Sequence, residues 1–446
     1  MSKFFLFFLL SFTSWLFSQN TINLEQAITM AQKKNLSLES SFYQMKSSQW
    51  VYQNARTQFF PKANLVYTGL FLKDDVVFDL RPLFPRPIIM QDQQNHAINL
   101  QVDQVFFAGG LFYHNYQISR LQYTMNQHQY SQMLLDIASK VTEYYYVQLQ
   151  TTATIEVLKF HLSLCEELMR NTEILFHNGI GLETDIMQWE LSMIEIENQL
   201  LSMHNAETNM IQSWALLLGV DNIYEVPRPE PVNLDEILME IRDYCKLEAT
   251  EKNILLNNFL LLVDSNNYNR KNLSLHQEVL LYWVKRARSD FLPTLFGSFT
   301  LELSNDNRLA KMHLSKEPSW QIMANLSFPL FHSLRNISNY RSNFYDVKSQ
   351  NVMLIESTKN LEIQARQSWF DFDSSANNVI QNEKHYLLAE RSLNIIRSLY
   401  QQGMTTNLAL TDAQNSVLTS NIQLIKSIYD CISIKDKLHN LQGGLE

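Results

Sequence analysis

Proline and glycine are missing from two very long stretches of this chain. All ten prolines and all ten glycines lie outside residues 111–178 and 330–402. Proline breaks helix interiors and glycine weakens them, so stretches without either permit very long helices. A helix over 111–176 would be about 100 Å long, at 1.5 Å per residue. Its apolar residues recur at coiled-coil spacing, for instance at Leu134, Ile137, Val141 and Tyr145. Such a rod cannot bury an apolar face alone, which predicts neighbouring helices.

Four short segments carry a different pattern, in which apolar and polar residues alternate. They are Ile98–Val102, Leu295–Ser304 and Gln321–Phe328, together with Ala63–Leu72, which is apolar and aromatic and alternates more weakly. A period of two with one apolar face is what a strand between lipid and water requires. It also fits a half-buried strand of a soluble protein. The pattern therefore predicts strands and leaves their surroundings open.

The chain contains an internal repeat. Ala55–Pro61 reads ARTQFFP and Ala287–Pro293 reads ARSDFLP, an offset of 232 residues. Further on, Gln104–Phe107 lies opposite Phe328–Phe331, and Phe176–Gly179 opposite Tyr400–Gly403, both at an offset of 224. Because that offset does not change over the long helices, we expect them to have equal length in the two halves. Each half then reads helix, strand, loop, strand, very long helix, glycine-marked turn, helix.

These patterns divide the chain into four parts. We expect a signal peptide at 1–18; a first repeat at 19–226, with a strand pair at about 63–106 and a helical hairpin at 108–218; a linker and equatorial segment at 227–275; and a second repeat at 276–446, with a strand pair at about 293–331 and a helical hairpin at 333–442.

The N-terminus predicts export from the cytoplasm. Lys3 is followed by the apolar run Phe4–Leu10 and, after Phe17, by the small residue Ser18. This order is typical of a cleaved secretory signal peptide. If the four predicted strands span a membrane, they are too few to close a barrel, for which eight is the smallest common number. The chain would then have to oligomerise, with two copies supplying eight strands or three supplying twelve.

Composition and motifs argue against several function classes. The net charge of −9 and the lack of a long basic run do not suit nucleic-acid binding. Three widely spaced cysteines form no disulfide framework or zinc pattern. The stretch Asp371–Ser375 resembles a calcium loop but lacks its glycine. We therefore predict no catalytic residue, no metal site and no cofactor.

Taken together, the motifs resemble the TolC-like outer-membrane efflux protein family over roughly residues 21–442. Each motif alone is weak, but they occur in order and largely in duplicate. They are Ile22–Ile28, the two Ala-Arg-x-x-Phe-x-Pro segments, Gln104–Gly110, Gly179–Glu190 and Gly403–Gln414.

The resemblance implies an α+β membrane protein of the Gram-negative outer membrane. Three protomers would share a twelve-stranded transmembrane β-barrel, continued by a periplasmic tunnel of twelve helices. The implied partners are a periplasmic adaptor (membrane-fusion) protein and an inner-membrane pump, in a tripartite efflux or type I secretion system.

The resemblance also implies which residues act. Gly179, Gly403 and Thr405 would belong to the periplasmic tips on which the adaptor docks. Asp185, Asp412 and Tyr400 would form the periplasmic gate. The chain departs from the family pattern at Thr405, which replaces an arginine, and at Ala409, which replaces one of two aspartates. Both glycines also suit ordinary helix ends, and both aspartates suit a first-turn or solvated helix face.

Three functions fit these observations. The first is a passive duct for small toxic compounds, and the second is a duct for secreted proteins; the sequence does not separate them. The third is a periplasmic coiled-coil adaptor or scaffold without a pore. An adaptor should contain one helical hairpin between β-rich domains, whereas this chain predicts two equivalent hairpins and two strand pairs.

Overall fold

The structure is a computed structural model that describes residues 21–74, 76–78, 88–91, 94–179, 181–306, 319–331 and 334–444. The predicted signal peptide at 1–18 lies outside these residues. No helix among them is both long and apolar enough to cross a bilayer.

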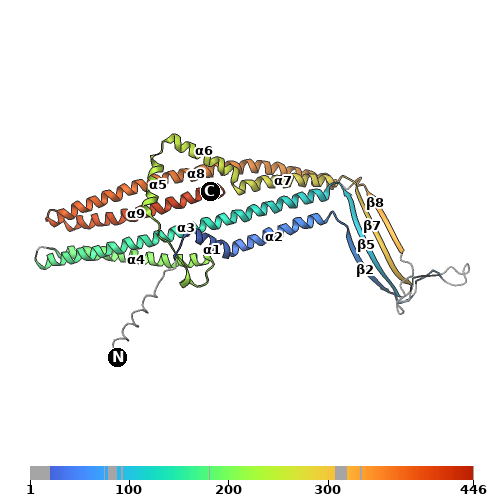
Figure 1. Ribbon diagram of the computed structural model, residues 1–446, viewed down its shortest axis with the longest axis horizontal. Helices are drawn as coiled ribbons and strands as arrows, with labels where there is room; N and C mark the ends of the chain where they lie inside the picture. The colour runs from blue at the N-terminus through green and yellow to red at the C-terminus, as the bar shows by residue number, and fades with distance from the viewer. Residues whose placement is uncertain are drawn as a thin grey trace, which may run out of the picture. The chain divides into compact units, whose positions relative to one another are not determined.

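The described chain is mostly helical (Figure 1). Its α-helices are α1 (Leu24–Lys34), α2 (Leu36–Thr57), α3 (Leu111–His177), α4 (Glu183–Leu218), α5 (Leu234–Lys246), α6 (Ala249–Asn266), α7 (Tyr268–Ser289), α8 (Arg335–Gln401) and α9 (Asn407–Leu441), with a short 3-10 helix at Ile223–Glu225. Its strands are β1 (Thr21–Ile22), β2 (Lys62–Phe71), β3 (Val76–Phe78), β4 (Ile88–Gln91), β5 (Gln94–Ala108), β6 (Arg228–Pro229), β7 (Thr294–Asp306) and β8 (Ser319–Ser327).

Contacts divide the chain into two compact units. The helical unit comprises Met1–Tyr43, His128–Lys271 and Ser357–Glu446. The sheet unit comprises Gln44–Gln127 and Asn272–Glu356. The long helices α3 and α8 contribute residues to both units.

The sheet unit is built on four antiparallel strands in the order β2-β5-β7-β8 (Figure 1). This confirms the four predicted strands. Every residue of the two edge strands, β2 and β8, is exposed in a single chain. Neither edge strand has a second neighbour in the part of the chain that the structure describes. The sheet therefore has two unpaired edges and exposed apolar side chains. Proteins that function as single chains usually cover or block such edges.

The strand register brings four helix ends to the same end of the sheet. Lys62 pairs with Asp103 near the β2 start, and Thr294 pairs with both Ala108 and Ser327. At this end α2 leads into β2 and α7 into β7, while β5 leads into α3 and β8 into α8.

The connection from β5 to α3 needs glycine. Gly109 has a φ of +59°, and an added Cβ there would lie 2.7 Å from the Leu292 Cβ and 2.8 Å from the Ser289 main-chain oxygen. The buried Ser289 hydroxyl donates a hydrogen bond of 2.7 Å to the Gly109 oxygen. This hydrogen bond thus joins the β5–α3 connection to the α7–β7 connection.

The helical unit contains two antiparallel hairpins, α3 with α4 and α8 with α9 (Figure 1). They share their cores. One cluster joins Val141 of α3, Trp214 of α4 and Ile425 of α9. A second, nearer the turns, joins Leu158 of α3, Trp189 of α4 and Leu410 of α9. Both predicted rods are continuous helices, and α3 and α8 have 67 residues each, as the constant repeat offset predicts.

The segment 227–275, expected as a linker and equatorial segment, is mostly helical, with α5, α6 and the first turns of α7. The reason is local: Asn233 caps α5, and Glu248 forms a reciprocal capping box with Glu251 at the start of α6. Only the proline-rich start is extended, where β6 pairs in parallel with β1.

Tyrosine and tryptophan side chains hold this extended start against the first hairpin. The Tyr145 hydroxyl of α3 lies 3.3 Å from the Ile22 oxygen and 3.1 Å from the Glu230 oxygen. The Trp214 indole of α4 donates to the Pro227 oxygen at 3.0 Å. Burial raises the pKa of Tyr145 to about 12, so this anchor keeps its proton at physiological pH.

Candidate functional site: the two helical turns

The turn between α3 and α4 closes around a left-handed glycine. Gly179 has a φ of +76°, and its amide donates to the Phe176 oxygen at 2.9 Å. The amide of Gly181 donates to the Leu175 oxygen at 3.1 Å. No atom lies within 4 Å of a Cβ added at Gly179, so glycine is needed here for its backbone conformation and not for space.

The turn between α8 and α9 is built in the same way. Gly403 has a φ of +71°, and its amide donates to the Tyr400 oxygen at 2.9 Å. The Met404 amide donates to the Leu399 oxygen, also at 2.9 Å. Thr406 then caps α9, because its hydroxyl accepts from the Ala409 amide at 3.3 Å. The cap is thus the neighbour of Thr405, the residue singled out from the resemblance.

A single side chain joins the two hairpins just beyond the turns. Asn407, only 3% exposed, donates from Nδ2 to the main-chain oxygen of Asp185 and to Oε1 of Gln188, both at 3.1 Å. Asp185 lies in the first turn of α4, and Asn407 begins α9. A buried amide with two charge-neutral partners makes a specific contact that apolar packing would not provide.

A second buried polar pair lies one heptad further along α9. Gln414 Nε2 donates to Nδ1 of His161 in α3 at 3.1 Å, and both side chains are 2% exposed. Burial lowers the pKa of His161. Since its Nδ1 accepts a hydrogen bond, the ring is held in the neutral form.

The predicted gate residues lie around these contacts. Asp185 is half-buried, and its main-chain oxygen accepts the hydrogen bond from Asn407. Asp412 lies on the exposed side of α9, between the buried Thr411 and Ala413. Tyr400 is partly buried and packs against the Leu158 cluster. The structure thus brings the Asp185 main chain to the second hairpin, and leaves the Asp412 carboxylate facing away from the core.

Asn407 and Gln414 were not predicted, although the sequence holds a signal for them. With Leu410 and Val417 they form the spacing i, i+3, i+7, i+10, which is the buried stripe of α9. A polar residue at such a position is unusual, because it must find a partner inside the packing. Buried polar residues at these positions commonly specify how helices pair.

The two turns offer no site for a resident ion within one protomer. In the described part of the chain, no group of three or more His, Cys, Asp or Glu side chains could hold a metal.

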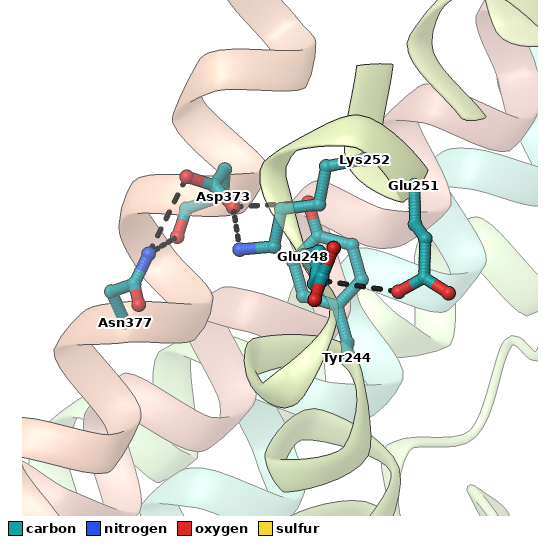
Figure 2. A network of polar contacts seen from close by, with 6 residues as sticks. All are labelled: Tyr244, Glu248, Glu251, Lys252, Asp373 and Asn377. Atoms are coloured by element: carbon teal, nitrogen blue, oxygen red, sulfur yellow. Dashed lines mark hydrogen bonds and ion pairs between the residues drawn. The ribbon is translucent and has the colours of Figure 1, made fainter. Parts of the chain in front are cut away.

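The helical segment 234–266 is fastened to the second hairpin by a network around Asp373 of α8. Figure 2 shows Lys252 of α6 and Tyr244 of α5 reaching the same carboxylate oxygen, at 2.7 and 3.1 Å. The Lys252 ammonium also lies 4.6 Å from the centre of the Tyr244 ring. The Asp373 that resembled a calcium ligand in sequence is therefore a helix-to-helix anchor.

Two further ion pairs also join α5 to the second hairpin. Arg242 of α5 pairs with Glu383 of α8, and Lys435 of α9 lies 2.9 Å from Glu240 of α5. Burial, and secondarily the neighbouring Asp373 carboxylate, raises the pKa of Tyr244. These contacts make α5 and α6 part of the same body as α8 and α9 within the helical unit.

Solved structures with the same fold include outer-membrane proteins and channels. CusC shares 14% identity over 96% of this chain and 94% of its own, with a TM-score of 0.79. The outer membrane protein VceC of Vibrio cholerae shares 16% identity over 94% and 96%, with a TM-score of 0.77. The CmeC outer membrane channel of Campylobacter jejuni shares 15% over 95% and 86%, with a TM-score of 0.78. Likeness at this level of identity establishes the fold.

The second half of the sequence also matches a family model. Residues 266–444 match the sequence model of the family described as outer membrane efflux protein. No curated protein sequence matches the chain. The match covers β7, β8 and the whole second hairpin, and a chain with this fold and two hairpins does not fit the adaptor alternative. Residues 266–444 thus match the outer membrane efflux protein family, and nearly the whole chain shares the fold of CusC and related outer-membrane proteins.

Proposed function

We propose that three copies of this chain form one continuous duct through the outer membrane and into the periplasm. The observation that supports it most directly is the sheet with two open edges, β2 and β8. Pairing β2 of one copy with β8 of the next would satisfy both edges, and three copies would close a barrel of twelve strands. Their hairpins would then line a tunnel of twelve helices.

Exposed apolar residues support this closure. Trp50 and Phe60 line an open groove of about 880 Å³ on α2 and the turn after it, next to the edge strand β2. On the other edge strand, Trp320 and Ile322 are largely exposed. A neighbouring copy would cover these residues, whose burial from water is favourable.

The test is the oligomeric state and the conductance of the mature protein. Native mass spectrometry in detergent should give a mass of three chains, and insertion into planar bilayers should give stepwise ion conductance. A monomer that conducts nothing, and that salt washing removes from membranes, would refute the duct.

We further propose that the two turns form the periplasmic end of the duct, where an adaptor protein docks and the entrance closes. Leu182 and Met404, beside the two turns, are 65% and 71% exposed. With Gly179, Gly403 and Thr405 they would offer apolar contacts to the helical tips of a partner. An inner-membrane pump would supply the energy for transport.

Closure of this entrance would rest on Asn407, Asp185, Asp412 and Tyr400. Asn407 holds α9 against α4, and in a trimer the three exposed Asp412 carboxylates would gather at the axis. Chemical cross-linking supplies a test of docking. Cysteines placed at Leu182 and Met404 should cross-link to an adaptor from the same organism, whereas a cysteine at exposed Leu261 of α6 should not.

A further inference from the structure

The helices that meet the sheet carry an unusual excess of positive charge. Within the sheet unit, their residues include nine Lys or Arg and three Asp or Glu, whereas the whole chain has 36 and 45. The nine are Lys46, Arg56, Arg120, Lys285, Arg286, Arg288, Arg335, Arg341 and Lys348. An acidic protein thus has a basic zone at one end of its sheet.

Six of these cations lie in α7 and α8, where several recur at helical spacing with apolar residues. In α7 the exposed residues Leu281, Lys285 and Arg288 follow the spacing i, i+4, i+7. In α8 the exposed residues Ile337, Arg341, Phe344 and Lys348 follow i, i+4, i+7, i+11. Each set lies along one face of its helix. We call these seven residues the junction stripe.

Aromatic rings support the cations of the stripe. The Lys285 ammonium lies 4.6 Å from the Tyr282 ring centre, and the Lys348 ammonium 4.9 Å from that of Phe344. Arg288 stacks on Tyr340 at 5.3 Å and donates to its hydroxyl at 3.0 Å, which joins α7 to α8. None of the four cations forms an ion pair with a carboxylate among the described residues. Their charge is available to an external anion.

The stripe begins where the sheet ends. Arg288 is next to the last residue of α7, and Arg341 is six residues into α8, about 9 Å along the helix. A bilayer has a hydrocarbon core of about 30 Å and a total thickness of about 40–45 Å, so each head-group layer is several ångströms deep. Long basic side chains reach into such a layer while their stems lie along apolar surface.

We propose that Lys285, Arg288 and Arg341 of the junction stripe, which lie within about 9 Å of their helix ends, bind the phosphate head groups of anionic phospholipids in the periplasm-facing leaflet of the outer membrane. The inference rests on the proposed function, in which the sheet spans that membrane. Basic side chains near an anionic surface attract it, and exposed apolar and aromatic neighbours suit the boundary between head groups and acyl chains. The stripe would set how deep the sheet sits in the bilayer.

Spin-labelled lipids test this directly. The full-length mature protein would be reconstituted in phosphatidylcholine vesicles that contain a trace of spin-labelled phosphatidylglycerol or of spin-labelled phosphatidylcholine. The motionally restricted fraction gives the relative affinity for the two head groups. We expect phosphatidylglycerol to be preferred about threefold or more at low salt, and the preference to fall towards onefold in 1 M salt.

The double variant Lys285→Glu with Arg341→Glu should lose the preference. Neither side chain is buried, so folding should be unaffected, as circular dichroism would show. The matched control is Lys359→Glu with Lys384→Glu, the same charge change on exposed residues of α8. Lys359 lies 24 residues into that helix, about 36 Å along it, and the control should keep the full preference.

The outcomes separate the two proposals. A restricted fraction that is equal for both head groups in the unaltered protein, or a preference retained by the double variant, would overturn the stripe alone. No restricted lipid of either kind would show that the sheet does not enter the bilayer. That result would overturn the proposed duct as well.

Discussion

Asn407 at the start of α9 is hydrogen-bonded through Nδ2 to the main-chain oxygen of Asp185 in the first turn of α4, at 3.1 Å. Its second bond, to Gln188 Oε1, has the same length. This buried amide therefore joins the two hairpins next to their turns. Opening an entrance by moving one hairpin away from the other must break these bonds.

Replacing Asn407 by Ala should favour the open entrance. Loss of a buried hydrogen-bonded partner costs about 1–3 kcal/mol, and about 1.4 kcal/mol changes an equilibrium tenfold. We expect a severalfold higher open probability in planar bilayers. Asn415→Ala, in the same helix, serves as control, because its side chain has no hydrogen bond to α4 among the described residues. Unchanged current traces would remove Asn407 from the closure.

Replacing Asp412 by Ala should weaken the block of the channel by multivalent cations. Three carboxylates close to one axis attract such cations, because like charges held together favour a counter-ion. Asp430→Ala changes an exposed carboxylate of the same helix and should leave the block unchanged. The measurement is the concentration of a trivalent cation that halves the current. Equal values for Asp412→Ala and the unaltered channel would contradict the gate role.

Gly109→Ala and Gly179→Ala should differ in their cost to stability. Both glycines have a positive φ, which costs other residues about 1–2 kcal/mol. At Gly109 the new Cβ would also collide with Leu292 and the Ser289 oxygen, whereas at Gly179 it would meet nothing within 4 Å. Thermal unfolding should therefore show a clearly larger loss for Gly109→Ala. Equal losses would mean that the connection from β5 to α3 relaxes freely.

Asp373→Ala should destabilise the helical unit. The substitution removes the acceptor of the Tyr244 hydroxyl and of the Lys252 ammonium, which are partly buried. We expect a loss of about 1–3 kcal/mol in the free energy of unfolding. Glu362→Ala breaks an exposed ion pair with Arg366 in the same helix and should cost less than about 0.5 kcal/mol. Denaturant unfolding compares the two.

The stability of the helical unit should fall on acidification because of His161. Burial lowers its folded-state pKa, so below the unfolded value of about 6.5 the unfolded chain binds a proton that the folded chain does not. The contribution is complete above that pH and is lost as the pH falls towards the folded pKa. His161→Gln should flatten the change in melting temperature between pH 7.5 and pH 5.5. A slope identical to that of the unaltered protein would exclude this residue.

The long helices could be predicted from sequence because glycines mark their ends. Gly109 and Gly110 precede α3, Gly179 follows it, and Gly403 follows α8, with no glycine or proline inside either helix. The strands could be predicted because alternation with a period of two distinguishes them from the coiled-coil spacing around them.

The contacts of the candidate site could not be predicted in the same way. Asn407 and Gln414 occupy positions at which the heptad pattern predicts apolar residues, and their partners are 219 to 253 residues away in sequence. Segment 234–266 was assigned only to a linker, since the prolines before it indicate extended chain, whereas Asn233 and Glu248 begin helices there. The local sequence pattern predicts where helices and strands lie. Which buried polar side chains pair between distant helices depends on how those helices pack.

The equal length of α3 and α8, 67 residues each, restricts how such a chain can evolve. One inserted residue would advance the end of one rod by about 1.5 Å and turn it by about 100°. Asn407 would then no longer face Asp185. Both hairpins can therefore be lengthened only together and only by whole heptads. The length of the helical hairpins then changes in steps of seven residues per helix.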